Sequence, residues 1–408
     1  MKHIGIIAEY NPFHNGHAFQ ISEIRKNYPD RNIVVCLSGD YVQRGEPCFF
    51  PKSLRTQCAL TGGADLIIEL PILFSSASSE HFATAGVTTL YKTGIVDTIC
   101  FGAECDDIDK LTFLADLFLN EPANYKNELK NNLSQGLSFP KARYNAVKAC
   151  FPETDYADIL ESPNNILAID YIKAIRKYNL PMTPFIVKRT SDNHNSLDTN
   201  NNICSSSALR NSIDNPVDNY NEWSNNLPLA VLDIINNSTY AKPMFINDFY
   251  PFLQNRLISD SNNLNDYFEM TEELSNTINN LTVLPATFDE LMDKITSKNN
   301  TMARIRRSLL NVLLSRTKNL VNEFSPDKTS YIRILGVKNN STHLIRTMKD
   351  NTDVPIINKI TNAKNVLSDR DLYLFNREIN ENMIYRQVYY NKYGMILPTE
   401  YQQSVIII

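Results

Sequence analysis

The sequence predicts an α/β fold: a Rossmann-like domain with a helix-covered parallel sheet, followed by a mostly helical C-terminal region. Over the first two hundred residues, short apolar runs alternate with helix-like segments. Continuous apolar strands of this kind are typical of parallel sheets that are buried on both faces. From about residue 215 the chain becomes Asn-rich, with helical periodicity and few strand-like runs. A length of 408 residues allows two or three domains.

Apolar runs and helical periodicity place the elements of the N-terminal half. Strands are expected over residues 3–8, 32–38, 64–70, 96–102 and 183–189. Helices are expected over residues 15–27, 52–60, 78–93, 107–119, 162–178 and 205–213. We therefore divide the chain into an α/β domain at 1–215, a helical domain at 216–325 and a small C-terminal α/β segment at 326–408.

Composition and charge limit the class of protein. Hydrophobic residues make up 43% and the net charge is −5, which argues against a nucleic-acid coat protein but is compatible with a local basic RNA-binding face. The seven cysteines are scattered, without the close pairs of a disulfide framework or a zinc ribbon. Cys100 and Cys105 sharing a metal is a minor alternative. The apolar runs are too short for a membrane span or a signal peptide, so we expect a cytoplasmic protein.

The loop after the first strand reads "AEYNPFHNGH". Ligands of parallel sheets bind at the carboxyl ends of the strands, where this loop lies. Pro12 and the Asn-Gly pair predict a tight turn that leads into a helix, and a helix N-terminus favours an anion such as phosphate. His14 and His17 lie about one helical turn apart, so both can reach that anion.

These histidines have two other possible interpretations. His17 begins an apolar series with Ile21, Ile24 and Tyr28, so it could be a core histidine. A zinc site is a weaker alternative because no third ligand has a suitable spacing. Two histidines and a glycine at the end of the first strand favour a functional site.

Two motifs carry a resemblance to a known superfamily. "FHNGH" resembles the His-x-Gly-His signature of the HIGH-type nucleotidylyltransferases, and "SSSALR" (205–210) resembles their second landmark, a Ser/Thr-rich turn ending in arginine. The resemblance implies a Rossmann-like HIGH-superfamily domain. It also implies that the two histidines contact the triphosphate and stabilise charge as pyrophosphate leaves.

A narrower resemblance rests on blocks that appear in order along the chain. They are "GIIAEYNPFHNGH", "LSGDYVQRGEP", "GADLIIELP", "CFGAE", "SPNNILAIDYIKA" and "RIRRSLLNVLL". Together they resemble the bacterial tRNA(Met) cytidine acetate ligase family. The resemblance implies ATP-dependent activation of acetate to acetyl-adenylate, followed by acetyl transfer to N4 of the wobble cytidine of elongator tRNA(Met). Such chemistry needs in-line positioning and neutralisation of pyrophosphate, with Mg²⁺ accompanying ATP, and no protein nucleophile.

The resemblance also implies site residues, with His14 and His17 as the catalytic pair. The implied ATP-binding residues are Ile7, Ala8, Glu9, Tyr10, Asn11, Pro12, Phe13, His14, Asn15, Gly16, His17, Ala18, Phe19, Gln20, Gly102, Asn164 and Arg189. Asn165 remains an alternative to Asn164. A departure from the family pattern after Arg189 leaves the role of His194 open.

Further phosphate contacts are expected from a second group of residues. Ser205, Ser207 and Arg210 would form a second phosphate grip at a helix start. Lys52 and Arg44, on loops at the same edge of the sheet, could neutralise phosphate. No metal site made of protein ligands is expected.

An arginine-rich amphipathic segment, residues 301–318, is the candidate tRNA-binding helix. Arg304, Arg306 and Arg307 could present guanidinium groups to RNA phosphates, although an ordinary solvated charged face is the alternative. The partners expected are acetate and tRNA. Nothing in the sequence indicates a protein partner.

Two rival functions remain open at this point. One is an adenylyltransferase that moves AMP onto a small phosphorylated metabolite. The arginine-rich helical half counts against it, because that reaction does not need such a region. The other is a non-catalytic, nucleotide-regulated RNA-binding protein. The intact histidines of "HNGH" count against it.

Overall fold

A single eight-stranded sheet forms the centre of the computed structural model, which describes residues 2–189, 205–212, 223–297 and 301–408. The strand order is β10-β8-β5-β2-β1-β6-β7, with β9 paired to β8. The strands are β1 (His3–Ala8), β2 (Ile33–Ser38), β5 (Leu66–Leu70), β6 (Val96–Ala103), β7 (Thr183–Lys188), β8 (Ile332–Val337), β9 (Ile356–Ile357) and β10 (Ile406–Ile407). Two further short strands, β3 (Tyr41–Val42) and β4 (Glu46–Pro47), form a separate antiparallel hairpin.

Strands β5, β2, β1, β6 and β7 are all parallel, which confirms the predicted Rossmann-like core. The chain runs outward from β1 through β2 to β5 and then returns to add β6 and β7 on the other side of β1. The gap between β1 and β6 is therefore a topological switch point, where open α/β sheets bind their ligands. Ile6 is opposite Cys100, so the loops after β1 and β6 leave the sheet side by side.

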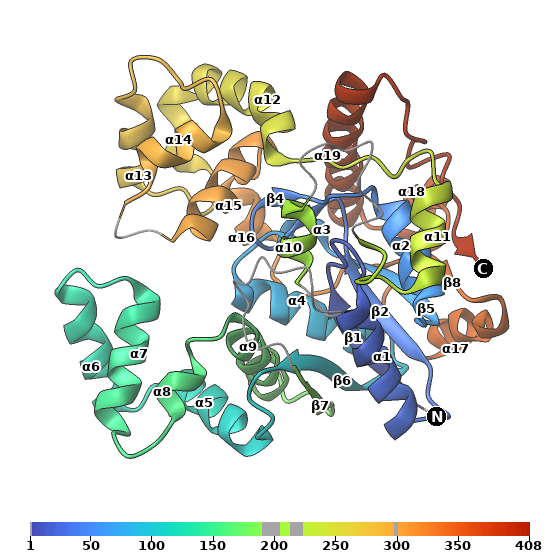
Figure 1. Ribbon diagram of the computed structural model, residues 1–408, viewed down its shortest axis with the longest axis horizontal. Coiled ribbons are helices and arrows are strands. Elements are labelled where there is room, and N and C mark those ends of the chain that lie inside the picture. Colours follow the sequence, from blue (N-terminus) through green and yellow to red (C-terminus); the bar gives the residue numbers. More distant parts are fainter. Residues whose placement is uncertain (1, 190–204, 213–222, 298–300) are drawn as a thin grey trace.

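Helices cover both faces of the sheet (Figure 1). On one face pack α4 (Ser79–Lys92), α5 (Ile108–Asn120) and α9 (Pro163–Lys177); on the other pack α1 (Asn15–Asn27), α2 (Lys52–Thr61) and α11 (Leu229–Asn237). Side chains of β2 alternate between the two cores: Val34 and Cys36 enter the first, Val35 and Leu37 the second. Burial on both faces explains why the strand is apolar throughout.

A group of helices between α5 and α9 has no counterpart among the expected elements. It consists of α6 (Ala123–Ser134), α7 (Phe139–Cys150) and the short α8 (Tyr156–Ile159). Helices α6 and α7 lie side by side at the outer edge of the molecule (Figure 1). Two more helices of this half are short. Helix α3 (Ile72–Ser75) follows β5, and helix α10 (Ser206–Asn211) begins at the second residue of the "SSSALR" motif.

The predicted helical region is confirmed and has its own core. It contains α12 (Ile246–Ser259), α13 (Glu272–Asn279), α14 (Phe288–Ile295), α15 (Met302–Leu313) and α16 (Lys318–Glu323). Apolar side chains of α12 to α15 pack together with Tyr385 and Tyr389 from α19 (Asp369–Tyr393). This core also takes in Tyr41 of β3, which ties the helical lobe to the hairpin beside the sheet.

The part of the chain expected to be a small C-terminal α/β segment, 326–408, contributes strands to the central sheet. Strand β8 pairs antiparallel with β5, and β10 pairs parallel with β8, so both extend the central sheet. Helices α17 (His343–Asn351) and α18 (Ala363–Val366) lie between these strands in the chain. The sequence could not reveal these pairings. Strand β5 lies more than two hundred residues before β8, and β10 has only two residues.

No helix in the described part of the chain is long and apolar enough to cross a membrane.

A buried arginine fixes the loops at the carboxyl edge of the sheet. Arg55, on α2, is 1% exposed. Its guanidinium donates to the backbone carbonyls of Glu9 (2.7 Å), Ser38 (3.0 Å) and Phe50 (3.1 Å), and to that of Gly39. One side chain thus joins the loops that follow β1 and β2.

Replacing this guanidinium should destabilise the protein strongly. In Arg55→Met, methionine retains most of the side-chain length but leaves buried carbonyls without a donor, so we expect a loss of about 3 kcal/mol of unfolding free energy. Equilibrium urea denaturation measures it. The matched control is Arg176→Met, which removes a half-exposed arginine paired with Asp116 and should change stability by about 0.5 kcal/mol or less. Equal effects in the two variants would contradict the role given to Arg55.

Candidate functional site

Two histidines cap the N-terminus of α1, directly after β1. His14 Nδ1 accepts a hydrogen bond from the N–H of Gly16 (3.0 Å), and His17 Nδ1 accepts one from the N–H of His14 (3.2 Å). The two imidazole rings lie 3.8 Å apart, centre to centre. This is a reciprocal capping box with histidine in both positions, and it holds the two rings together at the switch point.

The backbone donors at the start of α1 are already used within the protein. The N–H of Asn15 donates to the carbonyl of Asn226 (2.8 Å), and those of His17 and Ala18 donate to the carbonyl of His14 (2.9 and 3.1 Å). The expectation that free helix N–H groups would bind an anion is therefore wrong for this conformation. The side chains around the cap, and not its backbone N–H groups, are therefore the groups available to contact a ligand.

Both rings are neutral donors at neutral pH. Because each Nδ1 accepts a hydrogen bond, the proton of the neutral ring is on Nε2. Burial, aided by nearby Arg189 and Arg210, lowers the pKa of His14 to about 3. Burial, aided by His14 and Arg189, also lowers the pKa of His17 well below its usual value. The histidines thus supply N–H groups, while the positive charge beside them comes from arginines.

The first of these arginines comes from the "SSSALR" motif. Arg210 on α10 donates to the backbone carbonyl of Asn11 (2.7 Å) and to Ser207 Oγ (3.3 Å). Burial lowers its pKa, but a guanidinium keeps its proton in proteins. Ser205 Oγ caps α10 by accepting from the N–H of Ala208 (3.1 Å). The two candidate phosphate-binding motifs, HNGH and SSSALR, therefore lie next to each other as expected.

The second arginine faces the end of β6. The backbone N–H of Arg189 donates to the carbonyl of Ala103 (2.9 Å), which continues the β6–β7 pairing. A Cβ added to Gly102 would lie 3.3 Å from Arg189 Cγ, so a side chain at this position would press on the arginine. Arg189 Nε lies 3.8 Å from Glu104 Oε1, and Asn164 Nδ2 donates to the same oxygen (2.8 Å). Glu104, which is not among the predicted site residues, thus contacts both Arg189 and Asn164.

The two asparagines that the sequence left as alternatives differ in their hydrogen bonding. Asn165 is buried, and its side-chain oxygen accepts from the N–H groups of Glu104 (3.0 Å) and Cys105 (2.9 Å) while its amide donates to the carbonyl of Ile159 (3.0 Å). Its polar atoms are committed to holding the loop after β6. Asn164 is half-buried and faces the arginine side of the site, which favours it as a ligand contact.

The remaining residues of the first loop divide into buried and accessible positions. Tyr10 and Phe13 are 1% exposed, and Asn11 Oδ1 accepts from the N–H of Phe49 (2.7 Å), so these side chains support the loop. Phe19 is 38% exposed on α1. Gln20 Nε2 donates to the carbonyl of Cys100 (3.4 Å), which joins α1 to β6.

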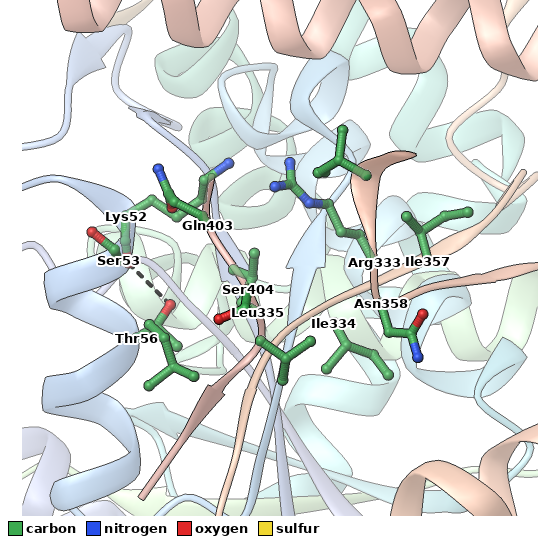
Figure 2. Close-up of a pocket in the computed structure, with 13 residues that line it drawn as sticks. Lys52, Ser53, Thr56, Arg333, Ile334, Leu335, Ile357, Asn358, Gln403 and Ser404 are labelled. Carbon is green, nitrogen blue, oxygen red and sulfur yellow. Dashed lines mark hydrogen bonds between the residues drawn. The ribbon is translucent and has the colours of Figure 1, made fainter. Parts of the chain in front are cut away.

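Lys52 does not take the place expected for a phosphate contact. It begins α2, is 4% exposed, and its Nζ lies 2.7 Å from both Glu69 Oε1 and Glu400 Oε1. Figure 2 shows it lining a pocket with Arg333 and Gln403. Arg333 completes the cluster by pairing with the same two glutamates. Lys52 is thus committed to a buried ion-pair cluster, and one of the carboxylates that hold it, Glu400, lies far away in the sequence.

The three arginines of α15 do not share one exposed face. Arg304 is exposed, as the expected RNA-binding face requires. Arg307 is 8% exposed and pairs with Glu269 (2.7 Å), so it is not available to RNA. Arg306 is half-buried and pairs with Glu46 of β4. Helical periodicity could not reveal these two partners, because neither lies on the same helix.

No cluster of three or more His, Cys, Asp or Glu side chains suitable for a metal ion occurs among the described residues. The Cys100–Cys105 alternative has no support there, and burial raises the pKa of both thiols, which disfavours the thiolates that a metal would need. His194 lies outside the described residues.

A doubly wound sheet with paired histidines and arginines at its switch point is typical of a nucleotide-binding α/β protein. The model of the family described as HIGH Nucleotidyl Transferase matches residues 1–397. The chain belongs to this family, within the group of tRNA(Met) cytidine acetate ligases, as the relatives below show.

Two relatives carry that name. The tRNA(Met) cytidine acetate ligase of Caldanaerobacter subterraneus subsp. tengcongensis is 34% identical over 393 residues, which cover 96% of each chain. That of Acetivibrio thermocellus is 33% identical over 417 residues and covers both chains completely. The crystal structure of Thermotoga maritima TmcAL bound with alpha-thio ATP has the same fold, with a TM-score of 0.90 at 24% identity over the whole of both chains. The resemblance inferred from the motifs is confirmed.

The neutral state of the histidine pair has a measurable consequence. Both pKa values lie below the usual 6.5, so the ring NMR signals of His14 and His17 should not titrate between about pH 5.5 and 8 in the ligand-free protein. Because the folded pKa lies below the unfolded one, protonation favours unfolding, and the stability that these neutral rings contribute is lost as the pH falls below about 6.5. A ring signal assigned to either residue that titrates near 6.5 would contradict the buried, neutral pair.

Proposed function

We propose that this chain activates acetate with ATP to form acetyl-adenylate and then transfers the acetyl group to N4 of the wobble cytidine of elongator tRNA(Met). The observation that carries the proposal is the convergence of His14, His17, Arg189 and Arg210 at the switch point of the sheet. The names of the relatives at 33% and 34% identity support the choice of substrates.

In the first step an acetate oxygen attacks the α-phosphorus of ATP, a new P–O bond forms, and pyrophosphate leaves with the electrons of the broken bond. The Nε2–H groups of His14 and His17 donate to phosphate oxygens, and Arg210 and Arg189 neutralise the charge that develops on the leaving group. In the second step the N4 amine attacks the acetyl carbon, AMP leaves, and the amine loses a proton. Neither step needs a nucleophile from the protein.

Magnesium is expected to accompany the nucleotide. Because the described residues offer no cage of three or more protein ligands, they fit an ion bound mainly through triphosphate oxygens and water, as is common for Mg²⁺. The ion would neutralise phosphate charge alongside the arginines.

The helical region is the proposed tRNA-binding part. Arg304 on α15 and Lys294 on α14 are exposed cations on successive helices of this lobe. Phosphate contacts from such cations supply affinity that falls with salt concentration. Arg307 is left out of this surface because of its buried pair with Glu269.

The test of the function is an exchange assay followed by a transfer assay. ATP–pyrophosphate exchange should require acetate, and labelled acetate should then appear in elongator tRNA(Met). Exchange that is independent of acetate would favour an adenylyltransferase acting on a small phosphorylated metabolite. No exchange, together with retained tRNA binding, would favour the non-catalytic RNA-binding alternative. Either result would overturn the proposal.

A substitution of His14 separates its two roles. In His14→Asn the side-chain oxygen can still accept from the N–H of Gly16 and keep the cap, whereas the Nε2–H donor is lost. We expect acetate-dependent exchange to fall by about 10²-fold or more. The thermal unfolding midpoint and the affinity for tRNA, measured by filter binding, should stay close to those of the parent. Undiminished exchange in this variant would remove the histidine from the reaction.

A further inference from the structure

The β3–β4 hairpin separates helix α15 from the candidate ATP site. The turn of the hairpin packs closely against the backbone of the helix. Its Gly45 has a φ of +79°, and a Cβ added there would lie 2.5 Å from the backbone N of Arg307. On the other side, the N–H of Gln43 donates to Glu9 Oε1 (2.8 Å) in the loop after β1. The hairpin therefore contacts both the helical lobe and the catalytic loop.

A single carboxylate on this hairpin lies between two arginines. Glu46 Oε1 accepts a hydrogen bond from Arg306 Nη1 on α15, and Glu46 Oε2 lies 3.9 Å from Arg210 Nη2. The side chains of Glu46, Arg306 and Arg210 are 20%, 29% and 17% exposed. Partial burial keeps solvent from screening the interactions fully. Arg306 is thus in closer contact with the Glu46 carboxylate than Arg210 is.

The looser contact matters because Arg210 belongs to the phosphate-binding motif. A carboxylate bound closely to Arg210 would neutralise its charge and compete with a triphosphate for the same N–H groups. With Arg306 holding one oxygen of Glu46, the carboxylate is kept from closing fully onto Arg210. Removing Arg306 would leave Glu46 with Arg210 as its remaining arginine among these residues.

We propose that Arg306 is a positioning residue for ATP binding, which acts by holding Glu46 away from Arg210. The inference rests on the proposed function only in assigning phosphate binding to Arg210. It connects α15, the helix expected to meet RNA, to the nucleotide site through one shared carboxylate.

The proposal is tested by comparing the ATP affinities of two single variants and their double variant. ATP affinity is measured by calorimetry without acetate or tRNA, so that an RNA-binding role of α15 does not enter. Arg306→Ala should weaken ATP binding by about three- to tenfold, the size expected for a partly buried ion pair. Glu46→Gln should strengthen it by about two- to threefold, because Arg210 loses its competitor. The double variant should match Glu46→Gln, since Arg306 has nothing left to hold.

Rescue of Arg306→Ala by Glu46→Gln is the decisive result, because a merely structural arginine would not be rescued by the loss of its partner. A double variant as weak as Arg306→Ala, or parental affinity in Arg306→Ala, would overturn the proposal. The matched control is Asp248→Asn, which removes the similarly buried Lys392–Asp248 pair between α12 and α19 and should leave ATP affinity unchanged. Failure of the parent protein in acetate-dependent exchange would count against the proposed function instead, and the affinity measurements would still decide this inference.

Discussion

The hydrogen bonds of Arg55 are the constraint on which the site depends. Parallel sheets bring their functional loops to one edge, but the sheet itself does not fix those loops once the strand pairing ends. Here one buried guanidinium holds backbone carbonyls from the loops after both β1 and β2. The residue after β1 that it holds, Glu9, begins the stretch that leads to the histidine cap. The position of the two rings is thus set by the protein before any ligand arrives.

Charge at the site is divided between two kinds of side chain. His14 is buried, His17 is half-buried and both are neutral, so they add directed N–H groups without adding like charges to the arginines beside them. Arg189 and Arg210 carry the positive charge; Arg210 donates to a carbonyl and a serine hydroxyl, and Arg189 Nε lies 3.8 Å from a Glu104 carboxylate oxygen. Fixed donors of this kind need little reorganisation when negative charge develops on a substrate, which is the main electrostatic contribution of such sites.

Much of this could be predicted from local sequence, and the rest could not for a physical reason. The bounds of β1 and α1 were predicted to the residue because apolar periodicity and a turn signal are local properties. The histidines and the "SSSALR" arginine were found because they stand in short motifs. The partners of Lys52, Arg306 and Arg307 escaped prediction, since ion pairs across the fold leave no periodic pattern. Helices α6 and α7 were also missed: with only Tyr125 and Leu129 buried on α6, the apolar signal there is weak.

The central sheet also has a consequence for how the protein is made. Strand β5 lies between β2 and β8, and β8 in turn is flanked by β10, which ends at Ile407. A ribosome synthesises the chain from the other end, so the five parallel strands and their histidine cap can assemble while one edge of the sheet still lacks its neighbours. During that interval the hydrogen-bonding edge of β5 is open to pairing with strands of other nascent chains. Once β8 pairs with β5, this edge is covered and no longer available to another chain.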